Sequence, residues 1–310
     1  MAESELETKE QVETIWHLGG LTPKKLLKRV WDEINHDNVI NRASEIAYNF
    51  LFALFPMLLF LLAVLGLFAT SAPALRDELT GALARFLPGE AYSLISTTLQ
   101  EIVKNSGGGK MTFGIIIGLW SATGGMTTMM TLLDEAYHIR DSRSYIKFHA
   151  IGLGLTVAVS ALIIAALVIV LFGGHLTAWI GARLDWTHGA VLMWRILQWP
   201  AALCFVTFAF SLIYYFGPDV KEQHWYWITP GSIFGVLLWL LASFAFRVYL
   251  HFYNSYSKSY GSLGAVMLLL TWFYVTGIAF MIGGEINAVI EHAAAQRGHP
   301  EAKAPGEKAA

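Results

Sequence analysis

The sequence contains a single cysteine, Cys204, so no disulfide bond can form within the chain. This cysteine lies in an apolar run, where we expect a buried and unreactive thiol. Charged residues are also scarce: they make up 14% of the 310 residues, whereas soluble domains carry about 25%. Because 55% of the residues are hydrophobic, one core cannot bury them all, and several segments are expected to face lipid.

Other features are missing as well. The net charge of −2 argues against a nucleic-acid partner, because duplex-binding proteins carry a basic surplus. The first 40 residues contain no apolar core of the signal-peptide type. The ten histidines are scattered and form no H-x-x-x-H or H-E-x-x-H pair, and no phosphate-binding loop occurs. An intramembrane enzyme would need a nucleophile and a base, and neither Ser121 nor Ser243 has a His or Lys in helical register. We therefore expect no catalytic residue, no metal site and no cofactor.

Long apolar segments dominate what is present. From Leu263 to Gly284 the chain has 22 residues without a charge, enough for a helix to cross the roughly 30 Å core of a bilayer. Similar segments recur earlier, so the sequence predicts an all-α, polytopic membrane protein with six transmembrane helices. The predicted spans are 46–69, 111–133, 150–172, 191–216, 228–250 and 263–290.

Amphipathic helices outside the membrane complete the predicted membrane domain, 22–292. Thr22-Pro23 provides a cap and a first helical residue, and the helix that follows over 22–40 carries an apolar face and a basic flank. This helix is suited either to an anionic membrane surface or to packing on the protein itself. A second pair, with a turn at Pro88-Gly89, is predicted as a helical hairpin over 74–105. The acidic residues 1–21 and the tail 293–310 are predicted to be disordered.

The distribution of lysine and arginine predicts the orientation. Basic residues concentrate before the first span and in the loop after the second, which favours cytoplasmic termini in a bacterial inner membrane. Four carboxylates then lie near the inner boundary of the bilayer and two arginines near the outer one. Charges at such positions either snorkel to the headgroups or mark a pathway. The inner residues are Glu45, Asp134, Glu135 and Glu285; the outer ones are Arg195 and Arg247.

The second span is unusually polar. Gly124, Thr128, Thr131 and Glu135 recur on one stripe of the helix. We hypothesise that this stripe and the inner carboxylates line one polar cavity, together with Asn287.

Two further segments are expected to border this cavity. In the first span, Tyr48 and Asn49 precede Pro56, which is predicted to kink the helix near Phe52–Pro56. A loop before the last span is predicted to close the cavity from outside. Its motif residues are Tyr256, Lys258, Tyr260, Gly261 and Ser262.

Two glycine pairs have the spacing that permits close helix contact. Gly114/Gly118 and Gly231/Gly235 are each four residues apart. Such pairs serve packing within a chain or between copies, so they would also suit a homo-oligomer.

Laid out in this way, the chain resembles the YihY/BrkB family of bacterial inner-membrane proteins. The resemblance covers about residues 25–292, and it implies six transmembrane helices with cytoplasmic ends. Asp134 stands where the family more often has Asn. A ribonuclease label has been attached to the family, and the scattered histidines here give it no support. The matching pieces are Ala47-Tyr48, Leu54-Phe55-Pro56, Trp120-Ser121-Ala122, Leu133–Tyr137, Pro230-Gly231, Tyr256–Gly264 and Gly283–Asn287.

The sequence favours a transporter, or a translocator of lipid or a small solute, with a polar cavity between its helices. The alternative is a membrane scaffold or assembly factor, in which the amphipathic helices would bind lipid or partner proteins. Membrane lipids are the expected partners in both cases. A scaffold would give no saturable movement of any solute, and this distinguishes the two hypotheses.

Overall fold

The computed structural model describes residues 16–53, 108–184, 188–220, 228–252, 256–298, 302 and 304–306; within 108–118, 171–184, 188–192, 195, 256–263 and 265 it describes only the backbone. The described residues contain helices and turns and no strand, which confirms the all-α class. Two compact units are distinguished, 1–47 with 126–310, and 48–125. The predicted hairpin over 74–105 and the region around Pro56 lie outside the described residues.

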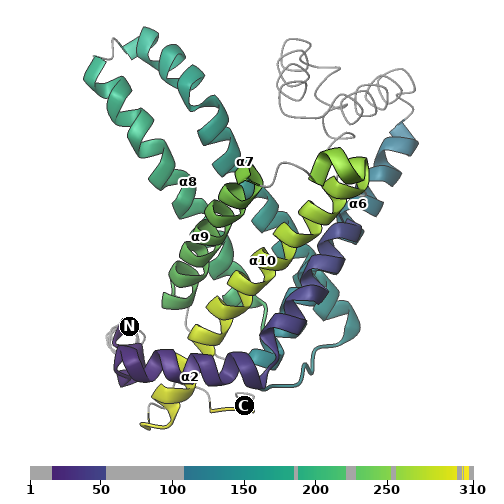
Figure 1. Ribbon diagram of the computed structural model, residues 1–310, viewed down its shortest axis with the longest axis vertical. Coiled ribbons are helices and arrows are strands. Elements are labelled where there is room, and N and C mark those ends of the chain that lie inside the picture. Colours follow the sequence, from purple (N-terminus) through teal and green to yellow (C-terminus); the bar gives the residue numbers. More distant parts are fainter. Residues whose placement is uncertain are drawn as a thin grey trace. The chain divides into compact units, whose positions relative to one another are not determined.

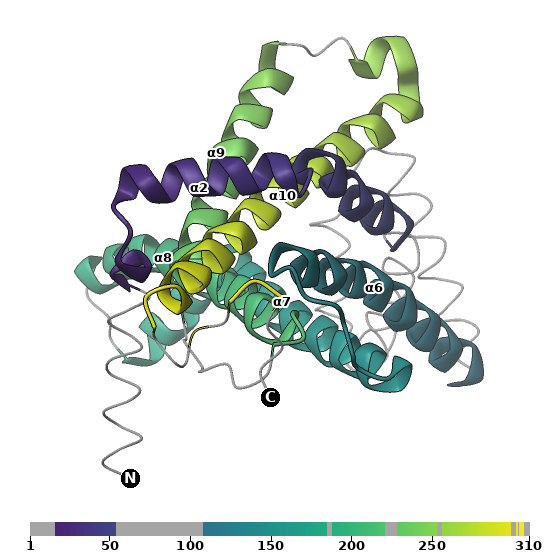
Figure 2. The same cartoon turned by 90° about the horizontal axis from the view of Figure 1, so that it is seen from below.

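Helix α10, Tyr256–Ala295, is the element on which the first unit is assembled. Helix α9, Pro230–Phe252, packs along it, and α2, Pro23–His36, lies across its C-terminal part (Figures 1 and 2). Three glycines of α10 bring other helices close, because each has no side chain to hold them apart. Gly277 meets the backbone at Ala43, Gly283 meets the Tyr214 hydroxyl and Gly231, and Gly284 meets Leu133.

Helices α7, Tyr145–Leu184, and α8, His188–Phe216, pack against each other (Figure 1). Long stretches of both are apolar on all sides, which is typical of helices surrounded by lipid and protein. Pro200 lies inside α8 without ending it, as is tolerated in membrane helices.

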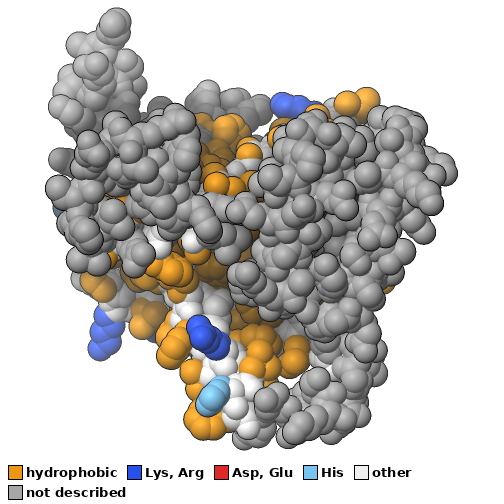
Figure 3. All heavy atoms as spheres, turned by 90° about the horizontal axis from the view of Figure 1, so that it is seen from above, with side chains coloured by type: hydrophobic (Ala, Val, Ile, Leu, Met, Phe, Trp, Pro, Cys, Tyr) orange, Lys and Arg blue, Asp and Glu red, His pale blue; other side chains and the backbone are white. Residues whose placement is uncertain are grey.

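Among the described residues, four helical stretches are long and apolar enough to cross a membrane: Tyr145–Val170, Ile196–Phe216, Pro230–Phe252 and Val266–Ala295. Their large hydrophobic side chains are widely exposed, including Leu167, Trp199, Leu241 and Phe244. On the face drawn in Figure 3 the described side chains are also mainly hydrophobic. These helices match four of the six predicted spans; the count of six remains a prediction.

The N-terminal amphipathic helix α2 has apolar residues on two sides. Leu26 and Val30 are buried against Val289 and Ile290 of α10. Trp31, in contrast, is 64% exposed, and the neighbouring Leu27 is exposed as well. The two interpretations offered by the sequence therefore concern different sides of α2: one side packs on the protein, and the other remains open to a membrane surface. The short 3-10 helix η1, Leu18–Gly20, also packs on α10.

The second unit is described only in part. A helix covers residues 39–53 and crosses from the first unit into the second. Helix α6, Gly108–Ala136, begins in the second unit and ends in the first. Within the second unit, the Phe50 ring lies where a side chain at Gly125 would stand, and the Tyr48 and Phe52 rings are 4.5 Å apart.

Two expectations need correction, and one alternative is resolved. The predicted loop over Tyr256–Gly264 is helical and forms the first turns of α10, because glycine within an apolar membrane helix does not suffice to end it. Cys204 is exposed on α8 rather than buried, since only one side of the apolar run that carries it, including Ala202 and Ala209, is buried. Of the two roles offered for the glycine pairs, Gly231 and Gly235 take the one within the chain, since both meet α10. A homo-oligomer stays a prediction. The side chains of residues 108–118 are not described, so a helix contact through Gly114 and Gly118 remains a prediction.

Candidate functional site

In the first unit, an ion-pair network lies where α6 and α8 end. The Arg143 side chain is 4% exposed and donates to Asp134 Oδ2 at 3.3 Å, to Asp141 Oδ2 at 2.7 Å and to the Gly217 carbonyl at 2.9 Å. Asp134 Oδ1 also accepts the backbone N–H of Asp219 at 2.6 Å. Burial raises the pKa of Asp134 to about 7, although this N–H and Arg143 both favour the ionised form.

A second set of polar contacts fixes the start of α9 on α10. Asn287 accepts the backbone N–H of Gly231 at 2.9 Å and donates to Thr229 Oγ1 at 3.0 Å. The Tyr214 hydroxyl donates to the Phe280 carbonyl at 2.7 Å. Asn287 thus supplies an acceptor for an N–H at a helix N-terminus, where no intrahelical acceptor exists. The structure assigns this predicted site residue a packing role.

Glu285 stands apart from these satisfied groups. Glu285 is 0% exposed, and neither of its carboxylate oxygens has a hydrogen-bond partner. It lies close enough to Asp37 and Glu33 of the α2 end to interact with both electrostatically. Buried ionisable groups normally acquire a partner, because an isolated charge is costly in a low-dielectric interior. Glu285 therefore stands out among the predicted site residues whose side chains are described.

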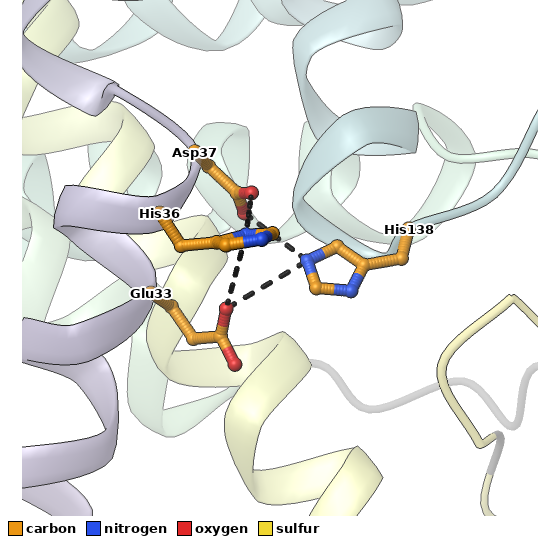
Figure 4. Close-up of side chains that lie close together, drawn as sticks. All are labelled: Glu33, His36, Asp37 and His138. Atoms are coloured by element: carbon orange, nitrogen blue, oxygen red, sulfur yellow. Dashed lines mark hydrogen bonds and ion pairs between the residues drawn. The ribbon is translucent and has the colours of Figure 1, made fainter.

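Beside Glu285, four side chains from two elements meet (Figure 4). Glu33, His36 and Asp37 come from the end of α2, and His138 follows the end of α6. His138 Nε2 lies 3.3 Å from Asp37 Oδ2 and 3.7 Å from Glu33 Oε2. His36 Nδ1 lies 2.8 Å from Asp37 Oδ1, and this hydrogen bond raises the pKa of His36.

The sequence did not predict that these four side chains lie together, because the metal motifs H-x-x-x-H and H-E-x-x-H require histidines close along the chain. Two histidines 102 positions apart in numbering are brought together by the fold. One signal was available: Glu33, His36 and Asp37 have i, i+3 and i+4 spacing, which puts three potential ligands on one side of a helix end. The expectation of no metal site rested on histidine pairs close along the chain, and it stays a prediction.

The polar stripe of α6 lies elsewhere. Thr131 is exposed, and its hydroxyl donates to the Thr127 carbonyl of the same helix at 3.1 Å. Glu135 pairs with Arg42 at 3.0 Å, and Arg42 also pairs with Glu45 at 3.1 Å. Burial raises the pKa of Glu135, and Arg42 opposes this shift.

Leu133 contacts α10 at Gly284, and Glu135, two residues on, points to a different side of α6. Glu135 interacts electrostatically with Asp37, and so does Glu285, whereas Asp134 pairs with Arg143. A single cavity lined by the inner carboxylates and the threonines stays a prediction. Thr128 is half-buried and lies on the same side of α6 as Thr131.

The remaining predicted residues are dispersed. Tyr48 is exposed and Asn49 half-buried, both in the second unit, and Arg247 is exposed on α9. Pro56 lies outside the described residues. For Arg195 and for the motif residues of 256–262, only the backbone is described, within α8 and α10.

Comparison with known protein families decides what kind of protein carries this arrangement. The family model of "Virulence factor BrkB" matches residues 30–307. The chain belongs to the BrkB family. This BrkB-family chain is thus an integral membrane protein, as its four apolar helices require.

Curated relatives agree with this membership. The chain is 31% identical over 250 residues to the "Putative ribonuclease-like protein YfkH" of Bacillus subtilis, covering 81% of this chain and 89% of that protein. It is 27% identical over 286 residues to a "UPF0761 membrane protein" of Xanthomonas oryzae, covering 88% of this chain and 61% of that protein. The BrkB-family chain therefore spans about three fifths of the length of this Xanthomonas relative. No solved structure matches it.

Proposed function

We propose that this BrkB-family protein binds and moves a polar or amphipathic solute, a class that includes lipid headgroups, across the bacterial inner membrane, with both termini in the cytoplasm. The observation that supports this proposal is the buried carboxylate of Glu285, without a hydrogen-bond partner on a helix that contains a membrane span. Ionisable groups inside membrane segments are rare and commonly belong to substrate or ion pathways.

The surroundings of Glu285 support the same proposal. Gly283 and Gly284 precede it, and both are sites of close helix contact, so small movements of α8 or α6 against α10 would change its environment. The N-terminus of α9 lies one turn away along α10, fixed by Asn287. Helix N-termini at transporter binding sites point at anionic groups of the substrate.

Replacement of Glu285 by glutamine tests this function. The change replaces the carboxyl group by an amide of nearly the same shape, so the variant should fold about as well as the natural protein. If Glu285 binds a coupling ion or the solute, flux should fall at least tenfold, since pathway carboxylates interact through their charge. The measurement is saturable uptake into proteoliposomes, using a panel of small polar solutes and fluorescent phospholipids.

Asp32→Asn provides the matched control, because this carboxylate is exposed on α2, and its flux should equal that of the natural protein. Saturable flux that is unchanged in Glu285→Gln would remove this residue from the mechanism. No saturable flux of any member of the panel in the natural protein would instead favour a scaffold.

The scaffold alternative has an observation of its own. Leu27 and Trp31 form an exposed apolar pair on α2, flanked by basic residues that would attract anionic headgroups. Such a helix can hold the protein end against a membrane or a partner protein without moving a solute. The basic residues are Lys24, Lys25, Lys28 and Arg29.

A fluorescent label measures whether this side of α2 contacts lipid. In a Cys204→Ala background, Leu27→Cys carrying an environment-sensitive dye should show blue-shifted emission in nanodiscs with anionic lipid, compared with zwitterionic lipid. The reason is that electrostatic attraction adds to apolar burial at the interface. Asp32→Cys is the control position. Equal emission from the Leu27 position in both lipids would contradict this contact.

A further inference from the structure

The four side chains shown in Figure 4 have the composition of a transition-metal site. Two imidazole nitrogens and two carboxylate oxygens face one another, and their ligand atoms all lie within 4.8 Å of one another. In a tetrahedral zinc site with bonds of 2.0–2.1 Å, neighbouring ligand atoms are about 3.3–3.4 Å apart. The nitrogen–oxygen separations are 2.8 Å to Asp37 Oδ1, 3.3 Å to Asp37 Oδ2, and 3.7 and 3.9 Å to Glu33 Oε2, on both sides of that value.

We propose that Glu33, His36, Asp37 and His138 together bind one divalent transition-metal ion of the Zn²⁺ class. Imidazole nitrogen and carboxylate oxygen are both ordinary zinc ligands, and the set of four completes a tetrahedral shell. His36 is 73% exposed at its side chain, so the ion has a direct path from solvent, while Asp37 and His138 form the more enclosed side.

The local charge balance favours a cation. The ion pairs of Glu33 and Asp37 among the described residues are with the two histidines, not with lysine or arginine. Behind them lies the carboxylate of Glu285, which is fully buried and has neither oxygen hydrogen-bonded. The carboxylates of Glu33 and Asp37 would thus be available to offset the charge of a divalent ion bound at the cluster.

The backbone at His138 provides an independent observation. His138 has φ +55° and follows α6 at the position that ends a Schellman motif, with the Ile139 N–H bonded to the Asp134 carbonyl and the His138 N–H to the Glu135 carbonyl. Glycine is the usual residue there, because it adopts this left-handed conformation without steric cost. Histidine at this position is strained by about 1 kcal/mol, and its side chain is the one that reaches the end of α2.

A bound ion would therefore connect two segments of the first unit. It would hold the end of α2 to the turn that follows α6, across the point where Glu285 is buried. This inference does not depend on the proposed transport activity, and its experiment measures no flux.

Purified, tag-free protein in detergent, treated with chelator and then dialysed, should be titrated with Zn²⁺ by calorimetry and with Co²⁺ by visible absorption. We expect saturable binding of one ion per chain and a tetrahedral Co²⁺ spectrum. Thermal stability should rise with the concentration of free ion, since a ligand that binds only the folded state stabilises it.

His138→Gly is the deciding variant, because glycine suits the backbone and removes a ligand. Its stability without metal should equal or exceed that of the natural protein, while its affinity for Zn²⁺ should fall at least tenfold. Glu33→Gln should weaken binding in the same direction, and His149→Ala, a half-buried histidine on α7 outside the cluster, should leave it unchanged. Absence of saturable binding, or His138→Gly binding as tightly as the natural protein, would overturn the proposal.

Discussion

Gly231→Ala is expected to prevent α9 from docking on α10. A Cβ atom at this position would meet the Gly283 carbonyl oxygen closer than real Cβ atoms come to any neighbour, and it would lie 2.5 Å from Asn287 Oδ1. The obstacle is backbone, which cannot rotate away, so the helices would have to separate. That would also break the hydrogen bond from the Gly231 N–H to Asn287. We expect a loss of at least about 3 kcal/mol in stability.

Thermal unfolding in detergent, together with the monodisperse fraction after purification, measures this loss. Gly154→Ala is the matched control, because nothing lies within 4 Å of a Cβ atom there. As a helical glycine on α7, its replacement should stabilise the protein slightly, by about 0.5–1 kcal/mol. A Gly231→Ala protein with the unfolding temperature of the natural chain would refute the close crossing.

The membrane helices were predictable because hydropathy is a local property. The span predicted over 191–216 ends at Phe216, where α8 ends, and the one predicted over 228–250 lies within two residues of α9 at both ends. The ends of α7 were less predictable: the helix covers Tyr145–Leu184 rather than 150–172. A polar residue such as Lys147 does not interrupt a helix, although it lowers the hydropathy that delimits a span.

The candidate site was much harder to predict, because it consists of contacts between residues distant in sequence. Helical periodicity correctly grouped Thr128, Thr131 and Glu135 on one stripe, but it could not tell which side of α6 meets α10. Leu133 occupies that contact, so the stripe points elsewhere. The prediction that Glu285 is special rested on the polar pair after Gly283-Gly284, and its complete burial is in keeping with that reasoning.

Arg143→Met is expected to have the other large effect, because it leaves a buried carboxylate without its cation. Arg143 is almost fully buried and pairs with Asp134, whose side chain is equally buried. Removing one member of such a pair costs about 3–5 kcal/mol. Arg140→Met is the control, since Arg140 is exposed three residues earlier, and its unfolding temperature should be close to that of the natural protein.

The pH dependence of this loss identifies its cause. The pKa of Asp134 is about 7 in the folded chain, above its ordinary value of 3.8, and loss of Arg143 would raise it further. Below these pKa values the carboxyl is protonated in both proteins, so the part of the loss due to Asp134 is small at pH 5.5. It grows as pH rises through 7, because ionising Asp134 without Arg143 is costlier.

The stability difference between Arg143→Met and the natural protein should therefore be larger at pH 8.5 than at pH 5.5. Adding Asp134→Asn should remove that pH dependence and restore part of the stability, because the amide oxygen can still accept the Asp219 N–H and no buried charge remains. A difference that is constant from pH 5.5 to 8.5 would mean that the arginine acts through its other contacts, with Asp141 and the Gly217 carbonyl.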